Sequence, residues 1–303
     1  MNTIAVVNQK GGCGKTTTAI NAAAAMAEMG RRVLLLDLDP QAHATIGLGH
    51  DPNSFFKTVY DVLTGPGTGL HDIAVQTGID RLDLAPCNVL LAGTELKLTS
   101  TPGKELLLAR ALRSVRDAYD VCVIDCPPSL GILTFNALVA STDIVVPVQV
   151  QYYALEGLRR LLEMVGIIRR RFHSQSAENV GLLLTFVENH TMFSRQVQAQ
   201  LREIFGDLVF QTVIHRNVRL AEAPSAGEPV LTYAPQSKAA ADYRALAAEI
   251  LRVSPAIVIS RRNRMKGGLQ KQLSAIFEGV WIPTRERSRE LVTPIHSQVI
   301  EST

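Results

Sequence analysis

The fold of this chain is decided by the stretch Lys10-Gly11-Gly12-Cys13-Gly14-Lys15-Thr16-Thr17, which follows an apolar run at residues 3–8. After it comes an alanine-rich segment that predicts a helix over residues 15–29. Glycines let backbone N–H groups converge on an anion without Cβ clashes, and a helix N-terminus adds free N–H groups and a positive dipole end. This order of elements predicts a phosphate-binding loop, in which Lys15 reaches the β- and γ-phosphates and the Thr16 hydroxyl ligates Mg²⁺.

A second lysine sets this loop apart from an ordinary phosphate-binding loop. The usual spacing has a glycine five residues before Gly14, but this chain has Gln9 there, and Lys10 follows. Lys10 therefore adds a cation that Lys15 does not need for its own contact with phosphate.

The composition is that of an ordinary globular protein. The chain has 303 residues, of which 47% are hydrophobic and 19% charged, so it can bury a full α/β core. Its net charge of +3 is too small to indicate nucleic acid by itself, so any basic surface must be local. We expect the four cysteines to be reduced, as in a cytosolic protein. We expect no signal peptide, because the first apolar run is only about five residues long and leads into the phosphate-binding loop. We expect no membrane span, because no apolar run reaches 18 residues.

Predicted strands and helices alternate along the chain. Strands are expected at 3–8, 33–37, 82–86, 121–125, 143–148, 180–187 and 208–214. Helices are expected at 15–29, 104–118, 130–140, 154–171, 193–205 and 239–252, whereas residues 41–80 are expected to be rich in turns. The alternation predicts an α/β fold with a doubly wound, mostly parallel sheet and helices on both faces.

Three carboxylates follow apolar strands. Asp37 and Asp39 end the second strand, and Asp125 ends the strand at 121–125. Ligands of open α/β sheets bind at the carboxyl ends of the strands, so these acids should lie near the phosphate-binding loop. Carboxylates beside a phosphate site suit Mg²⁺ that is held partly through water, and one of them can orient an attacking water. The alternative is that each aspartate only caps a helix or a turn.

These motifs resemble those of the ParA/Soj-type partition ATPases, in the deviant Walker A group of P-loop NTPases that also contains the MinD proteins. The resemblance runs in family order over residues 1–252 and is carried by segments 8–18, 37–41, 125–131, 152–158 and 216–225. It implies that the chain binds ATP and Mg²⁺, forms a homodimer on ATP and hydrolyses ATP slowly. It also implies a ParB-like activator with a basic N-terminal segment.

The resemblance assigns roles to single residues. Lys10 matches the lysine that reaches the phosphates of the partner's ATP, which makes it catalytic together with Lys15 and Asp39, the acid that positions the hydrolytic water. Asp37 and Asp125 match the acids around Mg²⁺, and Thr16 matches its direct ligand. The ATP-binding residues implied are Lys10, Gly11, Gly12, Cys13, Gly14, Lys15, Thr16 and Thr17, with Arg216 and Asn217 near the adenine.

Three positions depart from the family pattern. Cys13 replaces the valine of most relatives, and its thiol is expected to add sensitivity to thiol reagents. Gln151 stands where many relatives have glutamate, so it keeps hydrogen bonding but loses a charge. His190 stands where a relative has arginine, so one contact with DNA is in doubt.

DNA binding is also implied by the resemblance. Relatives bind DNA without sequence preference through basic residues that form one surface in the ATP dimer, and such binding is steeply dependent on salt. The alternative for each arginine is a solvated helix face. The candidates here are Arg195, Arg202, Arg216, Arg219 and Arg244.

The sequence predicts two parts, an ATPase domain at residues 1–252 and a basic extension at 253–303. Apolar residues at Leu269, Leu273, Ile276 and Phe277 predict a short amphipathic helix at about residues 266–279. It could pack on the ATPase domain, dock on a partner, bind DNA, or lie on an anionic membrane through residues 266–281.

The function expected from the sequence is that of a cytoplasmic, nucleoid-associated partition ATPase. It would bind DNA as an ATP dimer, leave DNA on hydrolysis, and position a chromosome, a plasmid or another cargo. The rival is a MinD-like ATPase that cycles on the membrane as a peripheral protein. A metabolic P-loop enzyme is a third alternative, but the sequence offers no evident site for a small substrate.

Overall fold

The computed structural model describes residues 1–150, 154–172, 177 and 179–252. The chain divides into two units, Met1–Ser254 and Pro255–Thr303, and the described residues belong to the first. The predicted helix at 266–279 and the departure at Gln151 lie outside the described residues. Within those residues, no helix combines the length and hydropathy needed to cross a bilayer.

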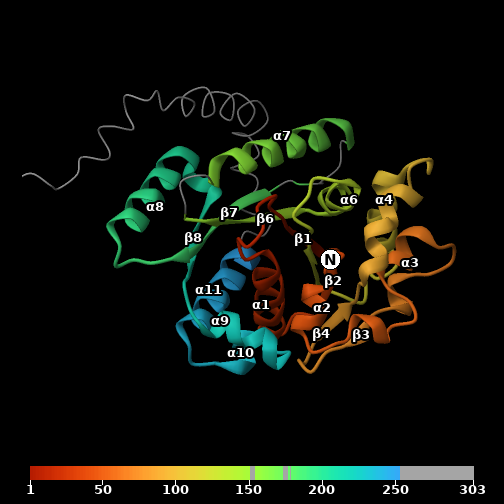
Figure 1. Cartoon of the computed structure of the whole chain (residues 1–303), viewed down its shortest axis with the longest axis horizontal. Coiled ribbons are helices and arrows are strands. Elements are labelled where there is room, and N and C mark those ends of the chain that lie inside the picture. The colour runs from red at the N-terminus through yellow and green to blue at the C-terminus, as the bar shows by residue number, and fades with distance from the viewer. Residues whose placement is uncertain (151–153, 173–176, 178, 253–303) are drawn as a thin grey trace, which may run out of the picture. The chain divides into compact units, whose positions relative to one another are not determined.

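The described strands form one eight-stranded sheet in the order β3-β4-β2-β5-β1-β6-β7-β8 (Figure 1). All neighbouring strands pair in parallel except β3, which is antiparallel to β4. The α/β class with a mostly parallel sheet is therefore confirmed. The strands are β1 (Asn2–Val6), β2 (Val33–Asp37), β3 (Val75–Gln76), β4 (Leu82–Ala85), β5 (Val121–Asp125), β6 (Asp143–Gln149), β7 (Asn179–Val187) and β8 (Val209–His215).

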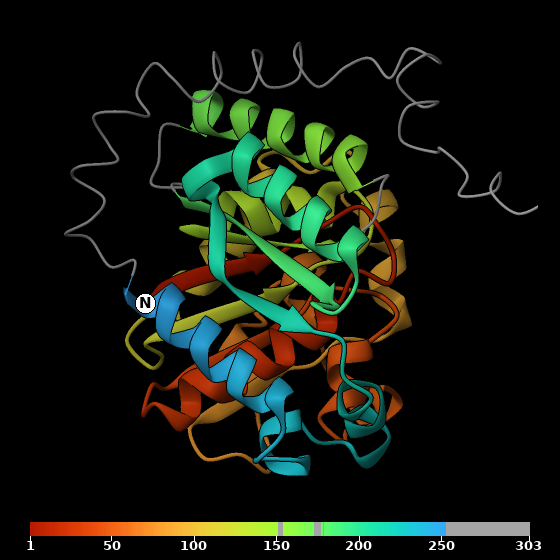
Figure 2. The same ribbon diagram turned by 90° about the vertical axis from the view of Figure 1, so that its left-hand side faces the viewer.

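Helices cover both faces of this sheet. α1 and α11 pack together on one face, and α6, α7 and α8 lie over the other (Figures 1 and 2). The helices are α1 (Lys15–Glu28), α2 (His43–Gly47), α3 (Val59–Thr64), α4 (Thr94–Lys97), α5 (Leu107–Arg113), α6 (Ile132–Ala140), α7 (Ala154–Phe172), α8 (Met192–Phe205), α9 (Arg219–Glu222), α10 (Val230–Tyr233) and α11 (Lys238–Arg252).

The central strands are buried on both faces, which explains their continuous apolar sequences. Val33 and Leu35 of β2 pack in the core cluster formed with α1 and α11, whereas Leu34 and Leu36 point to the opposite face and are equally buried. The alanines of α1 let this helix lie close to the sheet and to α11. These strands therefore hold the phosphate-binding loop and the strand-end acids on a rigid frame.

The structure differs from the sequence-based expectation mainly between residues 41 and 113. The segment expected to be rich in turns holds α2 and α3, and α3 begins at a capping box in which Thr58 and Asp61 satisfy each other's backbone N–H groups. The helix expected at 104–118 is shorter. A 3-10 turn at Lys104–Leu106 leads into α5, which ends at Arg113.

The strand β8 forms one edge of the sheet, and its backbone is covered by carboxylates of α11. The Glu249 side chain accepts hydrogen bonds from the backbone N–H groups of Gln211 and Thr212 at 2.8 and 2.9 Å. Asp242 accepts from the backbone N–H of His215 at 3.0 Å. The carboxylates of α11 thus occupy three N–H groups of this edge strand.

Candidate nucleotide-binding site

The predicted site residues meet at the carboxyl ends of three neighbouring strands, β2, β5 and β1. Asp125 is the register partner of both Asp37 on β2 and Val6 on β1. The chain continues from Val6 through Asn8 into the phosphate-binding loop, so the loop begins beside the two acids. The expectation that the loop and these acids lie at one sheet edge agrees with the structure.

The phosphate-binding loop is open toward solvent and held from behind. A Cβ added to Gly11 or Gly12 would meet no atom within 4 Å, and Gly12 has φ +71°, which favours glycine. Behind the loop, the Thr185 hydroxyl donates to the Cys13 carbonyl at 3.0 Å, and Asn8 donates to the Pro147 carbonyl at 2.7 Å. β6 and β7 therefore fix the loop while its front stays clear for a ligand.

Backbone donors and a buried lysine meet at the start of α1. Gly14 is the N-cap, and no side chain caps the first turn, so its N–H groups can bind an anion. Lys15 is buried, and its ammonium donates to the Lys10 carbonyl at 3.2 Å across the loop. The Lys10 backbone N–H in turn donates to the Asn8 side chain at 3.1 Å. This arrangement can bind a polyphosphate.

The cysteine of the loop is less reactive than the sequence suggested. Cys13 is fully buried, and this burial raises the pKa of its thiol, which leaves little of the reactive thiolate. The structure therefore does not favour the expected sensitivity to thiol reagents. Cys13 fits here as a small apolar residue.

Asp37 is buried and its carboxylate accepts three hydrogen bonds. Oδ2 accepts from the Thr45 backbone N–H at 2.8 Å and from the Thr45 hydroxyl at 2.7 Å, and Oδ1 accepts from the Asp39 N–H at 3.2 Å. Burial raises the pKa of Asp37, and the hydrogen bonds from Thr45 and Asp39 oppose that rise. With these oxygens engaged, Asp37 is suited to act on a cation through water.

Asp125 is equally buried, but neither oxygen of its carboxylate accepts a hydrogen bond of normal geometry from the described residues. Among those residues, the Thr16 hydroxyl is the one side chain placed to interact with it as a donor. Burial and the nearby charge of Asp37 raise the pKa of Asp125 well above its ordinary value, and Thr16 and Lys15 oppose the rise only in part. An unpartnered buried carboxylate beside a phosphate-binding loop is a fit for a hydrated divalent cation.

The site cannot hold a metal ion with its acids alone. In the described part of the chain, no three His, Cys, Asp or Glu side chains lie close enough to coordinate one ion. Mg²⁺ keeps several water ligands and is commonly bound through one or two carboxylates together with substrate phosphates. Thr16, Asp37 and Asp125 therefore fit Mg²⁺ that arrives with a nucleotide.

Asp39 lies on the turn after β2, where Cys87, a residue that sequence reasoning missed, contacts its backbone. Its Oδ1 accepts from the Gln41 N–H at 3.0 Å, and its carbonyl accepts from the Cys87 thiol at 2.8 Å. The Cys87 N–H donates to the Thr45 hydroxyl at 3.2 Å. Thr45 and Cys87 thus link Asp37 to Asp39. The contacts of Cys87 with Thr45 and Asp39 join residues over 40 positions apart, which no local sequence signal reveals.

The residues expected near adenine lie at the carboxyl ends of the strands, as the phosphate-binding loop does, but they are not beside that loop. Arg216 and Asn217 follow β8, which is separated from β1 by β6 and β7. Arg216 pairs with Glu188 at 2.9 Å, and the Asn217 side chain accepts from the Arg219 N–H at 3.0 Å. The structure shows an ordered polar loop at 216–219 without bringing it into contact with the phosphate-binding loop.

The candidate DNA-binding arginines differ in what already holds them. Arg219 pairs with Glu222 at 2.8 Å, and Arg202 donates to the Gln211 carbonyl at 3.2 Å. Arg244 donates to both Glu28 carboxylate oxygens, at 2.7 and 3.0 Å, and to the Pro235 carbonyl. Arg195 is exposed on α8. Arg244 is therefore the candidate with the clearest structural role.

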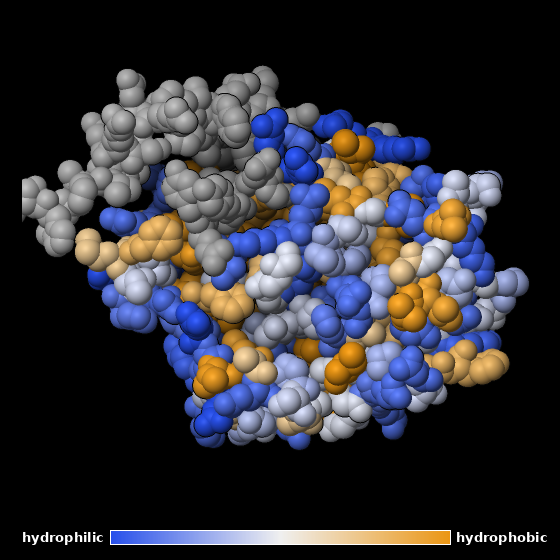
Figure 3. Space-filling model, in the orientation of Figure 1, coloured by the Kyte–Doolittle hydropathy of each residue, from blue (hydrophilic) through white to orange (hydrophobic). Residues whose placement is uncertain are grey.

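Apolar side chains are also exposed at the sheet edge that carries the site. The face in Figure 3 has small apolar patches among hydrophilic residues. Several exposed apolar side chains follow the carboxyl ends of β4, β7 and β8, namely Val89, Leu90, Met192, Phe193 and Val218. These side chains follow strands on both sides of the sheet, and singly exposed apolar residues of this kind are ordinary on a protein surface.

Comparison with known proteins agrees with this geometry. Residues 1–177 match the model of the AAA domain family designated AAA_31. The chain is 46% identical over 247 residues to the sporulation initiation inhibitor protein Soj of Bacillus subtilis, covering 82% of this chain and 97% of that protein. It is also 46% identical to the chromosome-partitioning ATPase Soj of Thermus thermophilus, covering 82% and 94%. The chain belongs to the ParA/Soj family of partition ATPases.

A solved structure extends the comparison of this ParA/Soj-family protein to a nucleotide-bound state. The cobyrinic acid a,c-diamide synthase of Mycobacterium smegmatis was crystallised with an ATP analogue and magnesium. It is 36% identical to this chain, covers 83% of this chain and 95% of its own, and superposes with a TM-score of 0.72. That relative shares the fold and carries the ligands that the donor set here fits.

Proposed function

We propose that this protein is a partition ATPase that dimerises on ATP, binds DNA without sequence preference as a dimer, and leaves DNA when hydrolysis separates the subunits. In this role it segregates a chromosome or a plasmid, or spaces another cargo over the nucleoid in the cytoplasm. The Soj relatives support this function over a metabolic one, because they are more similar to the chain (46% identical) than the diamide synthase is (36%).

The observation that carries the proposal is the unpartnered Asp125 carboxylate beside Lys15 and the phosphate-binding loop. In the proposed complex, the N–H groups of the loop and of α1 bind the phosphates, Lys15 turns from the Lys10 carbonyl to the β- and γ-phosphates, and Thr16 ligates Mg²⁺. Bound Mg²⁺ offsets the negative charge that the phosphates develop during hydrolysis. Asp37 and Asp125 accept hydrogen bonds from its water ligands.

The remaining catalytic roles fall to Asp39 and Lys10. Asp39 accepts a hydrogen bond from the attacking water and so orients it toward the γ-phosphate. Lys10 reaches the ATP of the second subunit, where its charge stabilises the transition state in the manner of an arginine finger. ATP then links the two subunits. Hydrolysis is slow until a ParB-like activator with a basic N-terminal segment binds.

The DNA surface is proposed to include the exposed Arg195 and the paired Arg202, Arg216 and Arg219. Because these side chains would contact phosphates, binding should weaken steeply with salt and show no base preference.

A side-by-side binding experiment tests this function. DNA retention and liposome co-sedimentation are measured with and without ATP and Mg²⁺, for the full-length protein and for a variant that lacks residues 266–303. Salt-sensitive DNA retention that requires ATP supports the proposal. ATP-dependent liposome binding that is lost with residues 266–303, without DNA retention, overturns it in favour of a membrane-cycling ATPase.

A further inference from the structure

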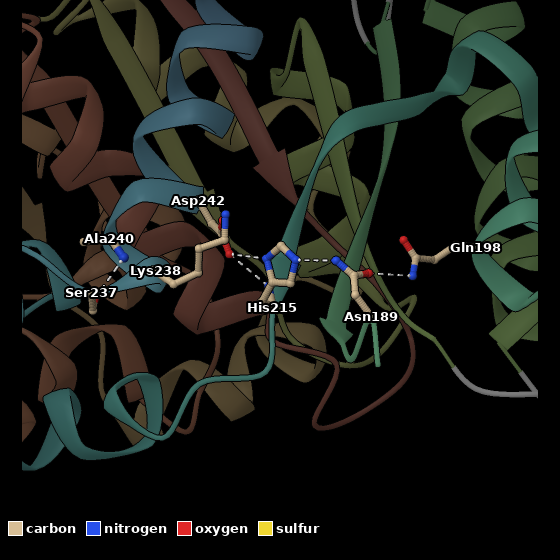
Figure 4. A network of polar contacts seen from close by, with 7 residues as sticks. All are labelled: Asn189, Gln198, His215, Ser237, Lys238, Ala240 and Asp242. Carbon is tan, nitrogen blue, oxygen red and sulfur yellow. Dashed lines mark hydrogen bonds and ion pairs between the residues drawn. The ribbon is translucent and has the colours of Figure 1, made fainter. Parts of the chain in front are cut away.

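A chain of polar side chains crosses the molecule from α11 to α8 and is not part of the nucleotide site (Figure 4). Asp242 on α11 contacts Nδ1 of His215 at 2.8 Å. Nε2 of His215 contacts the Asn189 side-chain nitrogen at 3.0 Å, and the Asn189 oxygen accepts from Gln198 on α8 at 3.3 Å. Four side chains from β8, two helices and the connection before α8 thus form one continuous hydrogen-bonded series.

Both ends of the series are anchored. Asp242 has a side chain only 6% exposed, and its other oxygen lies 3.4 Å from the ammonium of Lys238. At the far end, Gln198 also donates to the Ser194 hydroxyl at 3.3 Å, and that hydroxyl accepts from the Glu188 N–H. Asp242 and Gln198 are thus each held by several partners. The side chains between them, His215 and Asn189, are therefore held in place as well.

The order of donors and acceptors in this series follows from its chemistry when the His215 ring is neutral. The Asp242 carboxylate can only accept, so Nδ1 of His215 must carry the hydrogen. In a neutral ring Nε2 then accepts, and the Asn189 amide donates to it through nitrogen, which leaves the amide oxygen to accept from Gln198. Every donor therefore points toward Asp242, and each member of the series fixes the next one.

The series joins the two segments that carry four of the five candidate DNA-binding arginines. Arg195 and Arg202 lie on α8 on either side of Gln198, and Arg216 and Arg219 lie directly after His215. We infer that Asp242, His215, Asn189 and Gln198 form a positioning relay, which holds α8 and the 216–219 loop in the one arrangement that presents their arginines to the DNA backbone. His215 and Asn189 are positioning residues and do not touch DNA. This inference rests on the proposed DNA binding.

A spectroscopic test examines the relay without DNA. Nitrogen-15 NMR of the full-length protein near neutral pH should show His215 with hydrogen on Nδ1 and none on Nε2, and His215→Gln identifies the signal. In Asn189→Asp the new carboxylate can only accept, so both ring nitrogens should carry hydrogen. Among the charged groups nearby, Asp242 contacts the ring, Lys238 contacts Asp242, and Arg216, the next residue in the chain, pairs with Glu188. A wild-type ring with hydrogen on Nε2, or an unchanged ring in Asn189→Asp, overturns the relay.

A binding test examines its consequence for DNA. Asn189→Ala breaks the series and should weaken ATP-dependent DNA binding about tenfold, with ATP binding retained. In Asn189→Asp the carboxylate can accept hydrogen bonds from both His215 and Gln198, and the cationic His215 ring balances its charge. The DNA affinity of this variant should therefore stay within about threefold of wild type. Gln198→Ala breaks the series at a second point, and Gln200→Ala on the same helix is the matched control.

The outcomes separate the relay from the proposed function. If wild-type protein binds DNA but Asn189→Ala and Gln198→Ala bind as tightly as Gln200→Ala, the inference is wrong. Equal losses in Asn189→Ala and Asn189→Asp also contradict it, because the conservative change should rescue binding. If wild-type protein does not bind DNA at all, the proposed DNA binding fails, while the NMR experiment still decides whether the relay exists.

Discussion

Asp37 and Asp125 are register partners on the neighbouring strands β2 and β5, and both side chains are fully buried at the carboxyl edge of the sheet. Only Asp37 receives hydrogen bonds within the described chain. When both carboxylates are charged, they repel each other, and the charge of Asp125 is buried without a hydrogen bond of normal geometry. Both effects destabilise the ligand-free protein. We interpret this cost as the consequence of a site that is completed by a cation and a triphosphate.

Replacement of Asp125 by asparagine should stabilise the ligand-free protein. Because the pKa of Asp125 is raised in the folded state, the unfolded chain releases this proton first as the pH rises, and the native state loses stability. Asp125→Asn should therefore unfold like wild type below about pH 4 and be more stable by about 1–3 kcal/mol at neutral pH. Urea denaturation across pH measures this, and a variant that is less stable at neutral pH contradicts it.

Thr45 should contribute to stability through Asp37 and Cys87. In Thr45→Val the hydroxyl is lost, which removes a donor from Asp37 and leaves the Cys87 N–H without its acceptor. We expect the free energy of unfolding to fall by about 1–3 kcal/mol. Thr18→Val is the matched control, because the buried Thr18 hydroxyl has only a long contact, 3.4 Å, with the Tyr243 hydroxyl. If the two substitutions lower the free energy of unfolding equally, the hydrogen bonds that join Thr45 to Asp37 and Cys87 add no stability beyond that of an ordinary buried hydroxyl.

Lys10→Ala should separate nucleotide binding from dimerisation. Lys15 and the backbone donors remain, so ATP still binds, but the cation that reaches the second subunit's ATP is gone. Sedimentation analysis with a non-hydrolysable ATP analogue should find monomers where wild type forms dimers. Lys57→Ala, which removes an exposed lysine, should dimerise normally. A Lys10→Ala protein that dimerises like wild type refutes the role proposed for Lys10.

Asp39→Ala should hold the protein in its ATP-bound state. Without the acid that orients water, turnover should fall at least about a hundredfold, and the dimer should stay on DNA after activator is added. Phosphate release and DNA dissociation measured in parallel provide the test. Normal turnover in this variant rules out water positioning by Asp39.

Arg195 and Arg244 should differ in their effect on DNA binding. Arg195→Ala should reduce the slope of the log affinity against log salt by about 1, because one phosphate contact is lost. Arg244→Ala should leave that slope unchanged, since the guanidinium is already held by Glu28 and Pro235, and should lower stability by less than about 1 kcal/mol. The reverse pattern would assign the DNA surface to α11.

The parts of the fold that could be predicted are those in which the burial of an element is visible in its own sequence. The strands 33–37 and 121–125 were placed correctly, because a strand buried on both faces has a continuous apolar sequence and each run stops at an aspartate. The helices α2 and α3 were missed because nearby glycines indicated turns, although the Thr58–Asp61 capping box could have revealed α3. The motifs also predicted that Asp37 and Asp125 lie together at the carboxyl ends of their strands, as the structure places them.

The supporting residues of the site and the relay were not predictable in the same way. Thr45 and Cys87 meet only because β2 and β4 are neighbours, and His215 meets Asp242 only because α11 packs on β8. Such contacts depend on tertiary packing, and neither residue type nor spacing distinguishes these side chains from others on the surface. Motifs therefore identify the groups that would touch ligand, while the structure is needed to identify those that hold them.

The covered edge of the sheet restricts how this protein can assemble. An edge strand with free N–H groups is a template on which another chain can add a strand, and this can lead to aggregation. On β8 the N–H groups of Gln211, Thr212 and His215 are occupied by the carboxylates of Glu249 and Asp242. An incoming strand would have to displace these acids, so the sheet is protected from growth at this edge. Contacts between copies of this protein are therefore expected to involve other surfaces than the β8 edge.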